Sequence, residues 1–180
     1  MRSARPLLVA LLMAAVGLIS PAAAGATAAP STADAGINVR TVLLQWWHGG
    51  RQDNYLSGSP AGDANAERSN YVRVRIEGYG ESQYMYRTIP LVLYWHQGRR
   101  DNLVAATPAT HAAAQAAGYT RMWTETHVYS VRVAGTIPLD LYWHNGRGDN
   151  LTVANAAAKS AARAQGYVFV RTEGYVWPAS

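Results

Sequence analysis

Hydrophobic and polar residues alternate with a period of two along several short stretches of the chain, and this pattern is typical of β-strands. In residues 139–144, Leu, Leu and Trp alternate with Asp, Tyr and His. In residues 91–96, Leu, Leu and Trp alternate with Val, Tyr and His. A proline directly before each stretch favours a strand start or a sheet edge, because proline cannot donate a backbone hydrogen bond. We therefore predict strands whose leucine face packs in the core.

Two adjacent aromatic residues stand near the end of these stretches and of a third copy, and the alternation places them on opposite faces of the strand. The second aromatic shares the leucine face, so we expect it to be a buried anchor: Trp47, Trp95 and Trp143. The first shares the other face with a histidine, so we expect it to be exposed: Trp46, Tyr94 and Tyr142. Only the first aromatic is then placed to meet a ligand.

The aromatic pair opens a motif that occurs three times with a spacing of 48 residues. Counting with this period gives repeats at residues 33–80, 81–128 and 129–176. A fixed period indicates that each copy is one supersecondary unit packed against its neighbours. Because units of this size are marginally stable alone, we predict that residues 33–176 form a single cooperative domain.

Each repeat also contains an alanine-rich segment and a closing alternating stretch. The alanine-rich segments predict short helices at residues 61–69, 109–117 and 156–165. Gly118 and Gly166 follow the last two segments, and glycine commonly ends a helix. The closing stretches predict strands at residues 71–79, 119–127 and 167–175. The predicted fold class is mostly β with one short helix per repeat, in a pseudo-threefold closed three-repeat domain that is β-trefoil-like and leaves no open sheet edge.

The first 28 residues have the composition of a signal peptide and leader. Arg2 and Arg5 precede an apolar run over residues 7–19, and small residues follow it. The run is shorter than the ~20 residues of a membrane span, so the pattern predicts a secreted, extracellular protein without membrane insertion. The chain has no cysteine, so the secreted domain must be held by its core rather than by disulfides.

The charge of the chain does not indicate a nucleic-acid partner. The formal net charge of the full sequence is +5, and two of the positive charges, Arg2 and Arg5, belong to the leader. Acidic and basic residues are interspersed in the remainder, whereas a nucleic-acid-binding protein usually carries a clustered basic face.

The repeated motif combines side chains that are suited to sugars. Carboxylate and amide groups share hydrogen bonds with neighbouring hydroxyls, and an aromatic ring supports the apolar face of a pyranose. We therefore predict up to three equivalent shallow carbohydrate sites, one in each repeat. The predicted ligand-binding residues are Trp46, His48, Arg51, Asp53 and Asn54 in the first repeat, Tyr94, His96, Arg99, Asp101 and Asn102 in the second, and Tyr142, His144, Arg147, Asp149 and Asn150 in the third.

Other roles for these residues stay open at this point. Asp and Asn also favour turns and cap helices, and Arg can pair with Asp or with the glutamate of the closing strand: Glu77, Glu125 or Glu173. Turn oxygens can bind a metal, but a calcium loop normally has more carboxylates, and we predict no metal and no cofactor. Three equivalent copies describe a multivalent binder better than an enzyme, so we predict no catalytic residue.

Two other functions are compatible with the motif. One is a secreted protein-binding module such as an enzyme inhibitor, which would have one dominant exposed patch built from non-equivalent residues. The other is a glycoside hydrolase, which requires paired Asp and Glu side chains.

With its three tandem Tyr-Trp-His-x-Gly-Arg-x-Asp-Asn-type motifs and its closing Arg-x-Glu-Gly-Tyr strand, the chain resembles small secreted actinobacterial haemagglutinins of the three-repeat, rhamnose/galactose-binding type. The resemblance covers residues 33–176 and implies a lectin whose partners are cell-surface glycans or polysaccharide. It implies sites around the first aromatic, the Asp and the Asn of each motif. The second repeat departs from the pattern, with Trp123 in place of Arg and Thr126-His127 in place of Gly-Tyr, which predicts an altered or lost second site.

Overall fold

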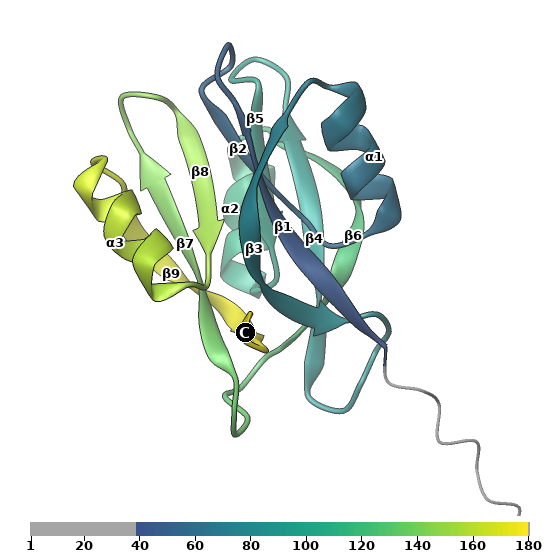
Figure 1. Ribbon diagram of the computed structural model, residues 1–180. Coiled ribbons are helices and arrows are strands. Elements are labelled where there is room, and N and C mark those ends of the chain that lie inside the picture. Colours follow the sequence, from purple (N-terminus) through teal and green to yellow (C-terminus); the bar gives the residue numbers. More distant parts are fainter. Residues whose placement is uncertain (1–38, 180) are drawn as a thin grey trace, which may run out of the picture. The chain divides into compact units, whose positions relative to one another are not determined.

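The order β–β–α–β occurs three times along the chain, once in each sequence repeat (Figure 1). The computed structural model describes residues 39–179, and the predicted signal peptide and leader, residues 1–28, lie outside the described residues. The first repeat comprises β1 (Arg40–His48), β2 (Asp53–Ser57), α1 (Pro60–Arg68) and β3 (Val72–Glu81). The second comprises β4 (Thr88–His96), β5 (Asp101–Ala105), α2 (Pro108–Ala116) and β6 (Thr120–Tyr129). The third comprises β7 (Ile137–His144), β8 (Asp149–Val153), α3 (Ala156–Ala164) and β9 (Val168–Val176).

The first strand of each repeat is the central one of three antiparallel strands. β1 pairs with β2 and β3, β4 with β5 and β6, and β7 with β8 and β9. Single-residue bridges join the repeats at Glu81 and His127, at Tyr129 and Tyr175, and at Tyr79 and Trp177. The strands of residues 39–179 thus belong to one antiparallel sheet. The predicted mostly-β fold with a short helix per repeat is confirmed, and its β-trefoil-like closure stays a prediction.

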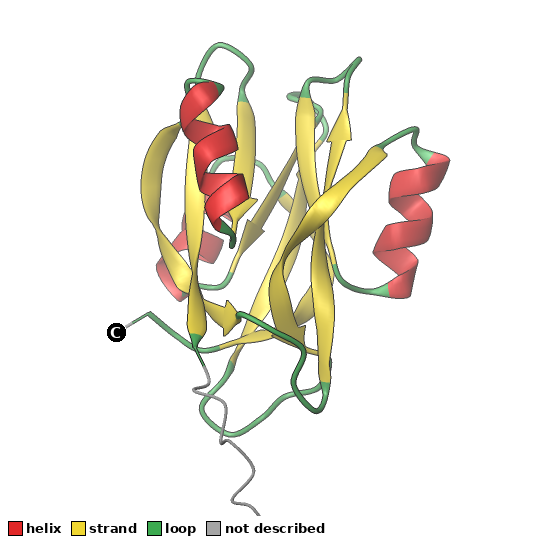
Figure 2. Ribbon diagram, turned by 90° about the vertical axis from the view of Figure 1, so that its right-hand side faces the viewer, coloured by secondary structure: helices red, strands yellow, loops and turns green. Residues whose placement is uncertain are grey.

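Each helix lies outside the strands of its own repeat (Figure 2). The side chains of Ser59, Thr107 and Asn155 cap the three helix starts by accepting hydrogen bonds from backbone N–H groups of the first turn. After α2 and α3 the chain turns at Gly118 and Gly166, which have left-handed φ values of +84° and +88°, as predicted. No helix of the described residues combines the length and the apolar character that a membrane span requires.

Leucines of the central strands form a core shared by the repeats, as the alternation predicted. Leu43, Leu91 and Leu139 are fully buried and belong to one cluster. The opposite face of each central strand is covered by the helix of the same repeat, and Tyr142 clusters there with Ala158 and Ala162 of α3. The central strands are therefore buried on both faces.

This helical cover makes the predicted exposure of the aromatic pair wrong. The first aromatic is buried, with an exposed fraction of 5% for Trp46, 2% for Tyr94 and 0% for Tyr142. The second aromatic is half-buried instead of fully buried: Trp47, Trp95 and Trp143. The register shifts in these pairings place the extra residues in the closing strands β3, β6 and β9, so they do not account for the error.

Candidate functional site

The Asp of each motif begins a short strand, at the point where β2, β5 and β8 pack together. Asp53 accepts hydrogen bonds from the backbone N–H of Asn102 at 3.0 Å, from its side-chain amide at 2.8 Å and from the Tyr71 hydroxyl. The same contacts connect Asp101 with Asn150 and Tyr119, and Asp149 with Asn54 and Tyr167. Each Asp therefore binds the Asn of another repeat. We call these nine residues the Asp–Asn ring.

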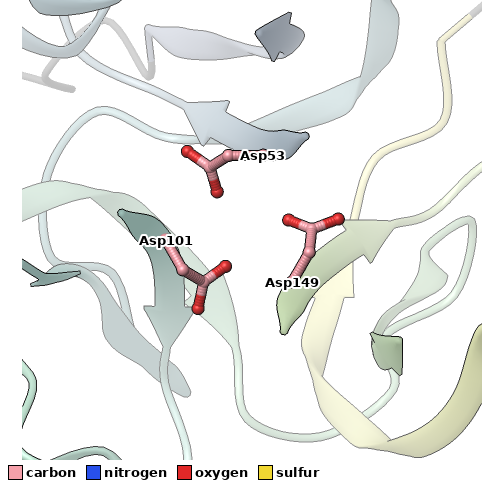
Figure 3. A group of neighbouring side chains, drawn as sticks. All are labelled: Asp53, Asp101 and Asp149. Atoms are coloured by element: carbon pink, nitrogen blue, oxygen red, sulfur yellow. The ribbon is translucent and has the colours of Figure 1, made fainter. Parts of the chain in front are cut away.

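The three carboxylates of the ring point toward one another (Figure 3). One oxygen from each lies within 4.8 Å of the others, so this group could hold a metal ion. Burial raises the pKa of Asp53 to about 8 and that of Asp101 to about 6, and it also raises the pKa of Asp149. Hydrogen bonds from Tyr and Asn oppose this rise. The carboxyl groups of the ring therefore retain protons to a higher pH than free aspartate does.

The His of each motif fixes the turn that precedes the Asp. His48 Nδ1 accepts a hydrogen bond from the backbone N–H of Arg51 at 3.1 Å, and His96 and His144 accept the equivalent bond. Each imidazole also meets the ring of its own repeat's Tyr edge-on, with 5.1 Å between the centroids of His48 and Tyr71. These contacts give the histidines a structural role in the turn.

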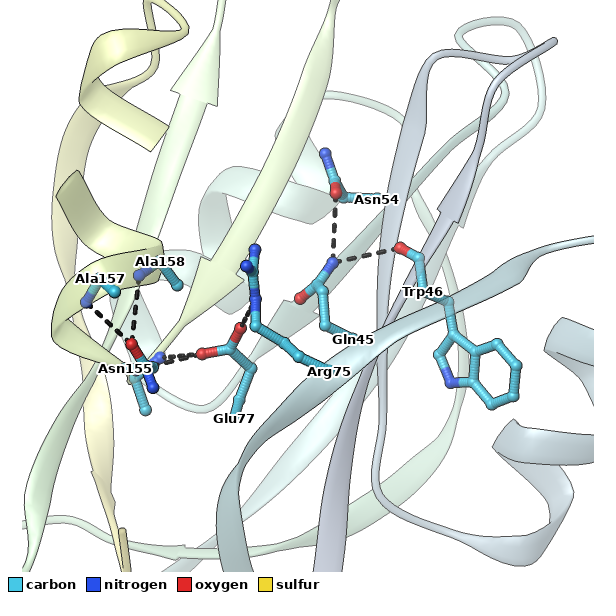
Figure 4. Close-up of polar contacts among 9 residues, drawn as sticks. Gln45, Trp46, Asn54, Arg75, Glu77, Asn155, Ala157 and Ala158 are labelled. Atoms are coloured by element: carbon cyan, nitrogen blue, oxygen red, sulfur yellow. Dashed lines mark hydrogen bonds and ion pairs between the residues drawn. The ribbon is translucent and has the colours of Figure 1, made fainter. Parts of the chain in front are cut away.

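A second set of buried carboxylates fastens each helix start to another repeat. Glu77 accepts hydrogen bonds from the backbone N–H groups of Ala154 at 2.9 Å and Asn155 at 3.1 Å, beside the start of α3 (Figure 4). Glu173 does the same for α2, and Glu125 accepts hydrogen bonds from the backbone N–H of Gly58 and the hydroxyl of Ser59 beside the start of α1. A carboxylate is favourable at this end of a helix because the N–H groups there are unpaired and the helix dipole is positive. Every pair of repeats thus shares one Asp–Asn contact and one glutamate anchor.

Three pockets with equivalent linings open between neighbouring repeats. Each is lined by the Arg of one motif together with the second aromatic and the Asn of another motif. We name them after the tryptophan: the Trp95 pocket contains Arg51 and Asn102, the Trp143 pocket contains Arg99 and Asn150, and the Trp47 pocket contains Arg147 and Asn54. Their volumes are about 210, 310 and 360 Å³ in that order.

In each pocket, the arginine of the repeated motif lies against two aromatic rings. The guanidinium carbon of Arg99 is 5.7 Å from the ring centroid of Tyr119 and 5.6 Å from that of Trp143. Arg51 and Arg147 make the same pair of contacts. Attraction between the cation and the aromatic faces holds the guanidinium in place. The pockets therefore offer flat apolar surface, N–H donors and an amide group side by side.

The structure divides the predicted site residues into two groups. The arginines and asparagines line the pockets: Arg51, Asn54, Arg99, Asn102, Arg147 and Asn150. The other nine do not line them and instead hold the fold together: Trp46, His48, Asp53, Tyr94, His96, Asp101, Tyr142, His144 and Asp149.

Sequence reasoning missed two positions that complete the pockets. One is the position of Trp47, Trp95 and Trp143, which the alternation predicts in the core. The second lies in the closing strand and is occupied by Arg75, Trp123 and Arg171. The difference among the repeats at this second position predicts an altered second site from the sequence, but the position itself is not among the predicted ligand-binding residues.

No protein-family model, no curated protein and no solved structure matches the chain. The function is therefore inferred from comparison of the three repeats with one another. The ring residues are identical in all three repeats, whereas the closing-strand position of the pockets is Arg, Trp and Arg.

Proposed function

We propose that the protein is a secreted, multivalent carbohydrate-binding lectin whose sites are the Trp47, Trp95 and Trp143 pockets. The observation that carries the proposal is the half-buried tryptophan that lines each pocket beside a stacked arginine. An indole face supports the apolar side of a sugar ring. The guanidinium and the asparagine amide supply hydrogen bonds for its hydroxyls. The ligand then contacts the Arg and Asn of the motif, but not the Asp.

The Asp–Asn ring orients the asparagine of each pocket. The side-chain nitrogen of Asn150 donates to Asp101 at 2.7 Å and to the Tyr119 hydroxyl at 2.9 Å. Its Oδ1 accepts no hydrogen bond from the described residues, and the same holds for Asn102. The Trp143 and Trp95 pockets therefore each keep an acceptor for a sugar hydroxyl.

The Trp47 pocket differs because its asparagine is already engaged. Gln45 Nε2 donates to Oδ1 of Asn54 at 3.2 Å (Figure 4). The equivalent positions in the other repeats are Leu93 and Leu141, which have no donor. We therefore expect the Trp47 pocket to be the weakest of the three sites.

The size and number of the pockets favour weak individual binding. Small-molecule sites usually have volumes of ~300–1,000 Å³, and the three pockets, at about 210 to 360 Å³, lie near or below the lower end of that range. Several weak sites on one domain bind a polysaccharide or a cell surface strongly when they act together. A β-trefoil-like closure of the sheet, which is part of this proposal, would hold the sites in a fixed array.

A tryptophan variant tests the proposal. Wild-type protein is expected to bind glycans on an array and to agglutinate erythrocytes, and Trp47→Ala/Trp95→Ala/Trp143→Ala is expected to lose both activities while its circular dichroism spectrum is retained. The matched control is Tyr84→Ala/Tyr86→Ala, which removes two aromatics outside the pockets with exposed fractions of 70% and 77%. Failure of the wild type to bind any neutral or acidic glycan at millimolar concentration would overturn the proposal.

One observation favours a protein-binding module, such as an enzyme inhibitor, as the second candidate. The loop between β3 and β4 exposes Tyr84 and Tyr86, whereas the equivalent residues after β6 are Arg132 and Ala134. A single patch of exposed aromatics suits a one-to-one protein interface. If this candidate is right, the wild type binds no glycan, and affinity capture from a secreted-protein mixture recovers a partner that Tyr84→Ala/Tyr86→Ala loses and the tryptophan variant keeps.

A further inference from the structure

We propose that the Trp143 pocket selects an anionic saccharide, whose carboxylate or sulfate group binds between Arg171 and Arg99. The inference rests on the proposed lectin function, because it names the ligand class of one proposed site. It starts from the closing-strand position at which the three pockets differ: Arg75, Trp123 and Arg171.

In two repeats this side chain is bound to the buried glutamate two residues later. Arg75 Nε lies 2.7 Å from Oε1 of Glu77 and forms an ion pair with it (Figure 4). Trp123 Nε1 donates to Oε1 of Glu125 at 2.9 Å. Both side chains thus satisfy a neighbouring carboxylate inside the protein.

In the third repeat the corresponding carboxylate has other partners. Glu173 Oε2 accepts hydrogen bonds from the backbone N–H groups of Ala106 at 2.8 Å and Thr107 at 3.0 Å. Oε1 accepts a hydrogen bond from the Thr110 hydroxyl at 2.5 Å. Arg171 makes no contact of this kind, and its Nε is buried without a hydrogen-bond partner among the described residues.

Thr110 is the helix residue whose side chain binds the carboxylate in the third repeat. The equivalent helix positions in the other two repeats are Gly62 and Ala158, which carry no hydroxyl. The Thr110 hydroxyl binds the carboxylate oxygen that is equivalent to the one that binds Arg75 or Trp123, whereas in the second repeat that oxygen of Glu125 accepts hydrogen bonds from both the Tyr55 hydroxyl and Trp123. Arg171 is a half-buried cation, and no carboxylate of residues 39–179 forms an ion pair with it.

The pocket around Arg171 contains a second cation and no acidic lining residue. Arg99 lines the same pocket, stacked on Tyr119 and Trp143, and it forms no ion pair within the described part of the chain. Guanidinium groups bind carboxylate and sulfate oxygens with paired, charge-assisted hydrogen bonds. The indole of Trp143 and Oδ1 of Asn150 remain for the uncharged part of the sugar.

The other two pockets lack this combination. In the Trp47 pocket the charge of Arg75 is balanced by Glu77. In the Trp95 pocket the same position is the neutral Trp123. Preference for an anionic saccharide is therefore expected of the Trp143 pocket.

Calorimetric titration with matched ligands measures this preference. An oligogalacturonate and its methyl ester share one backbone and differ in charge, and a sulfated galactan oligosaccharide and its desulfated form provide the second pair. We expect at least one acidic ligand to bind tighter than its neutral counterpart by about tenfold or more, because a hydrogen bond to a charged group exceeds the free energy of a tenfold change in affinity. The pair that shows the difference identifies the anionic group.

Three variants locate the effect. Arg171→Gln should reduce the ratio of the affinities for the acidic and neutral ligands to about twofold or less, because only Arg99 remains to bind the anionic group. Arg75→Gln, the matched control in the Trp47 pocket, should keep the preference. Thr110→Ala should weaken the preference although both arginines remain, because it frees Oε1 of Glu173 to pair with Arg171.

The outcomes separate this inference from the lectin proposal. Equal affinity of the wild type for the acidic and neutral ligands would overturn the inference and leave the lectin proposal standing. A preference that survives Arg171→Gln would overturn the assignment to this pocket. The absence of binding to all four ligands would overturn the inference, and the absence of glycan binding on the array would overturn the lectin proposal as well.

Discussion

The Asp–Asn ring and the three pockets are built from the same motif but differ in exposure and in free hydrogen-bonding groups. In the ring, Asp53, Asp101 and Asp149 each have an exposed fraction of 1%, and their oxygens are occupied by Asn and Tyr. In the pockets, the tryptophans are half-buried, and the arginine of the motif stacks on aromatic faces without a carboxylate partner among residues 39–179. One motif thus supplies both the joint between repeats and a surface for a ligand.

This difference explains why the ring residues are the same in every repeat. Asp101 contacts Asn150 of the next repeat, so a change in one repeat would disrupt a contact with another. Such mutual dependence is enough to keep a residue the same in every repeat even if it binds no ligand. Identity among the repeats therefore does not by itself indicate a ligand site, since the pocket Trp and Arg are identical in every repeat as well, whereas the closing-strand position distinguishes one pocket from another.

The largest effect should come from breaking the ring. Asp101→Ala leaves the backbone N–H and side-chain amide of Asn150 and the hydroxyl of Tyr119 without an acceptor. Each buried donor without a partner costs about 1–3 kcal/mol, so we expect a loss of about 4 kcal/mol or more in the free energy of unfolding. Urea denaturation measures the loss, and the exposed Glu67→Ala serves as control. Wild-type stability of Asp101→Ala would contradict a structural role of the ring.

Separate substitutions of the two aromatics of one motif should show that one residue mainly stabilises the fold and the other mainly binds the ligand. Tyr142→Ala removes a fully buried ring from beneath α3 and should cost about 3–5 kcal/mol of unfolding free energy. Trp143→Ala removes a half-buried ring and should cost less, while it weakens glycan binding. Urea denaturation and glycan titration of both variants provide the comparison. A larger stability loss for Trp143→Ala would show that the sequence-based assignment of the buried anchor was right after all.

The pH dependence of stability should come from the ring. Its carboxyl groups have raised pKa values: about 8 for Asp53 and about 6 for Asp101, against an ordinary value of 3.8. Between pH 3.8 and these raised values, the folded state therefore binds more protons than the unfolded state. Their stabilising contribution is fully present below about pH 4 and is lost as the pH rises through about 6 to 8. Thermal unfolding should therefore occur at a lower temperature at pH 9 than at pH 5. Asp53→Asn should flatten this dependence, and a profile as steep as that of the wild type would contradict the assignment.

The smallest expected effect is the difference in unfolding free energy between substitutions of Arg75 and Arg171, the two arginines at the closing-strand position of the pockets. Arg75 pairs with the buried Glu77, but its side chain is 39% exposed, so Arg75→Gln should lower the unfolding free energy by about 1 kcal/mol or less. Arg171→Gln breaks no hydrogen bond or ion pair in the described residues and should leave stability unchanged. Parallel urea titrations test this order. A greater loss for Arg171→Gln would mean that Arg171 has a structural partner.

Much of the fold could be predicted from the sequence because it depends on local patterns. The 48-residue period, the strands and the alanine-rich helices ending at Gly118 and Gly166 follow from periodicity and backbone preference. The exposure of the aromatic pair could not be predicted in this way. Alternation separates the two faces of a strand, but it does not show that a helix covers the second face, as α3 covers Tyr142.

The candidate site was predictable only in part. The arginines and asparagines of the motif do line the pockets, whereas the Asp side chains face inward. The alternative that Asp and Asn are structural was left open by the sequence, but their partners lie 49 residues away or, for Asn54 and Asp149, 95 residues away. Pairing across repeats depends on how the units pack together, and no local pattern reveals it.

Nuclear magnetic resonance of the indole N–H groups tests most directly whether the pockets bind the ligand. The chain has six tryptophans, and the indole signals of Trp46 and Trp177 provide internal controls because neither side chain lines one of the three pockets. During titration with a glycan selected on the array, the signals of Trp95 and Trp143 should shift most, followed by Trp47, while both controls stay in place. A titration that shifts the backbone signals of residues 144–149 but moves no pocket indole would contradict the account.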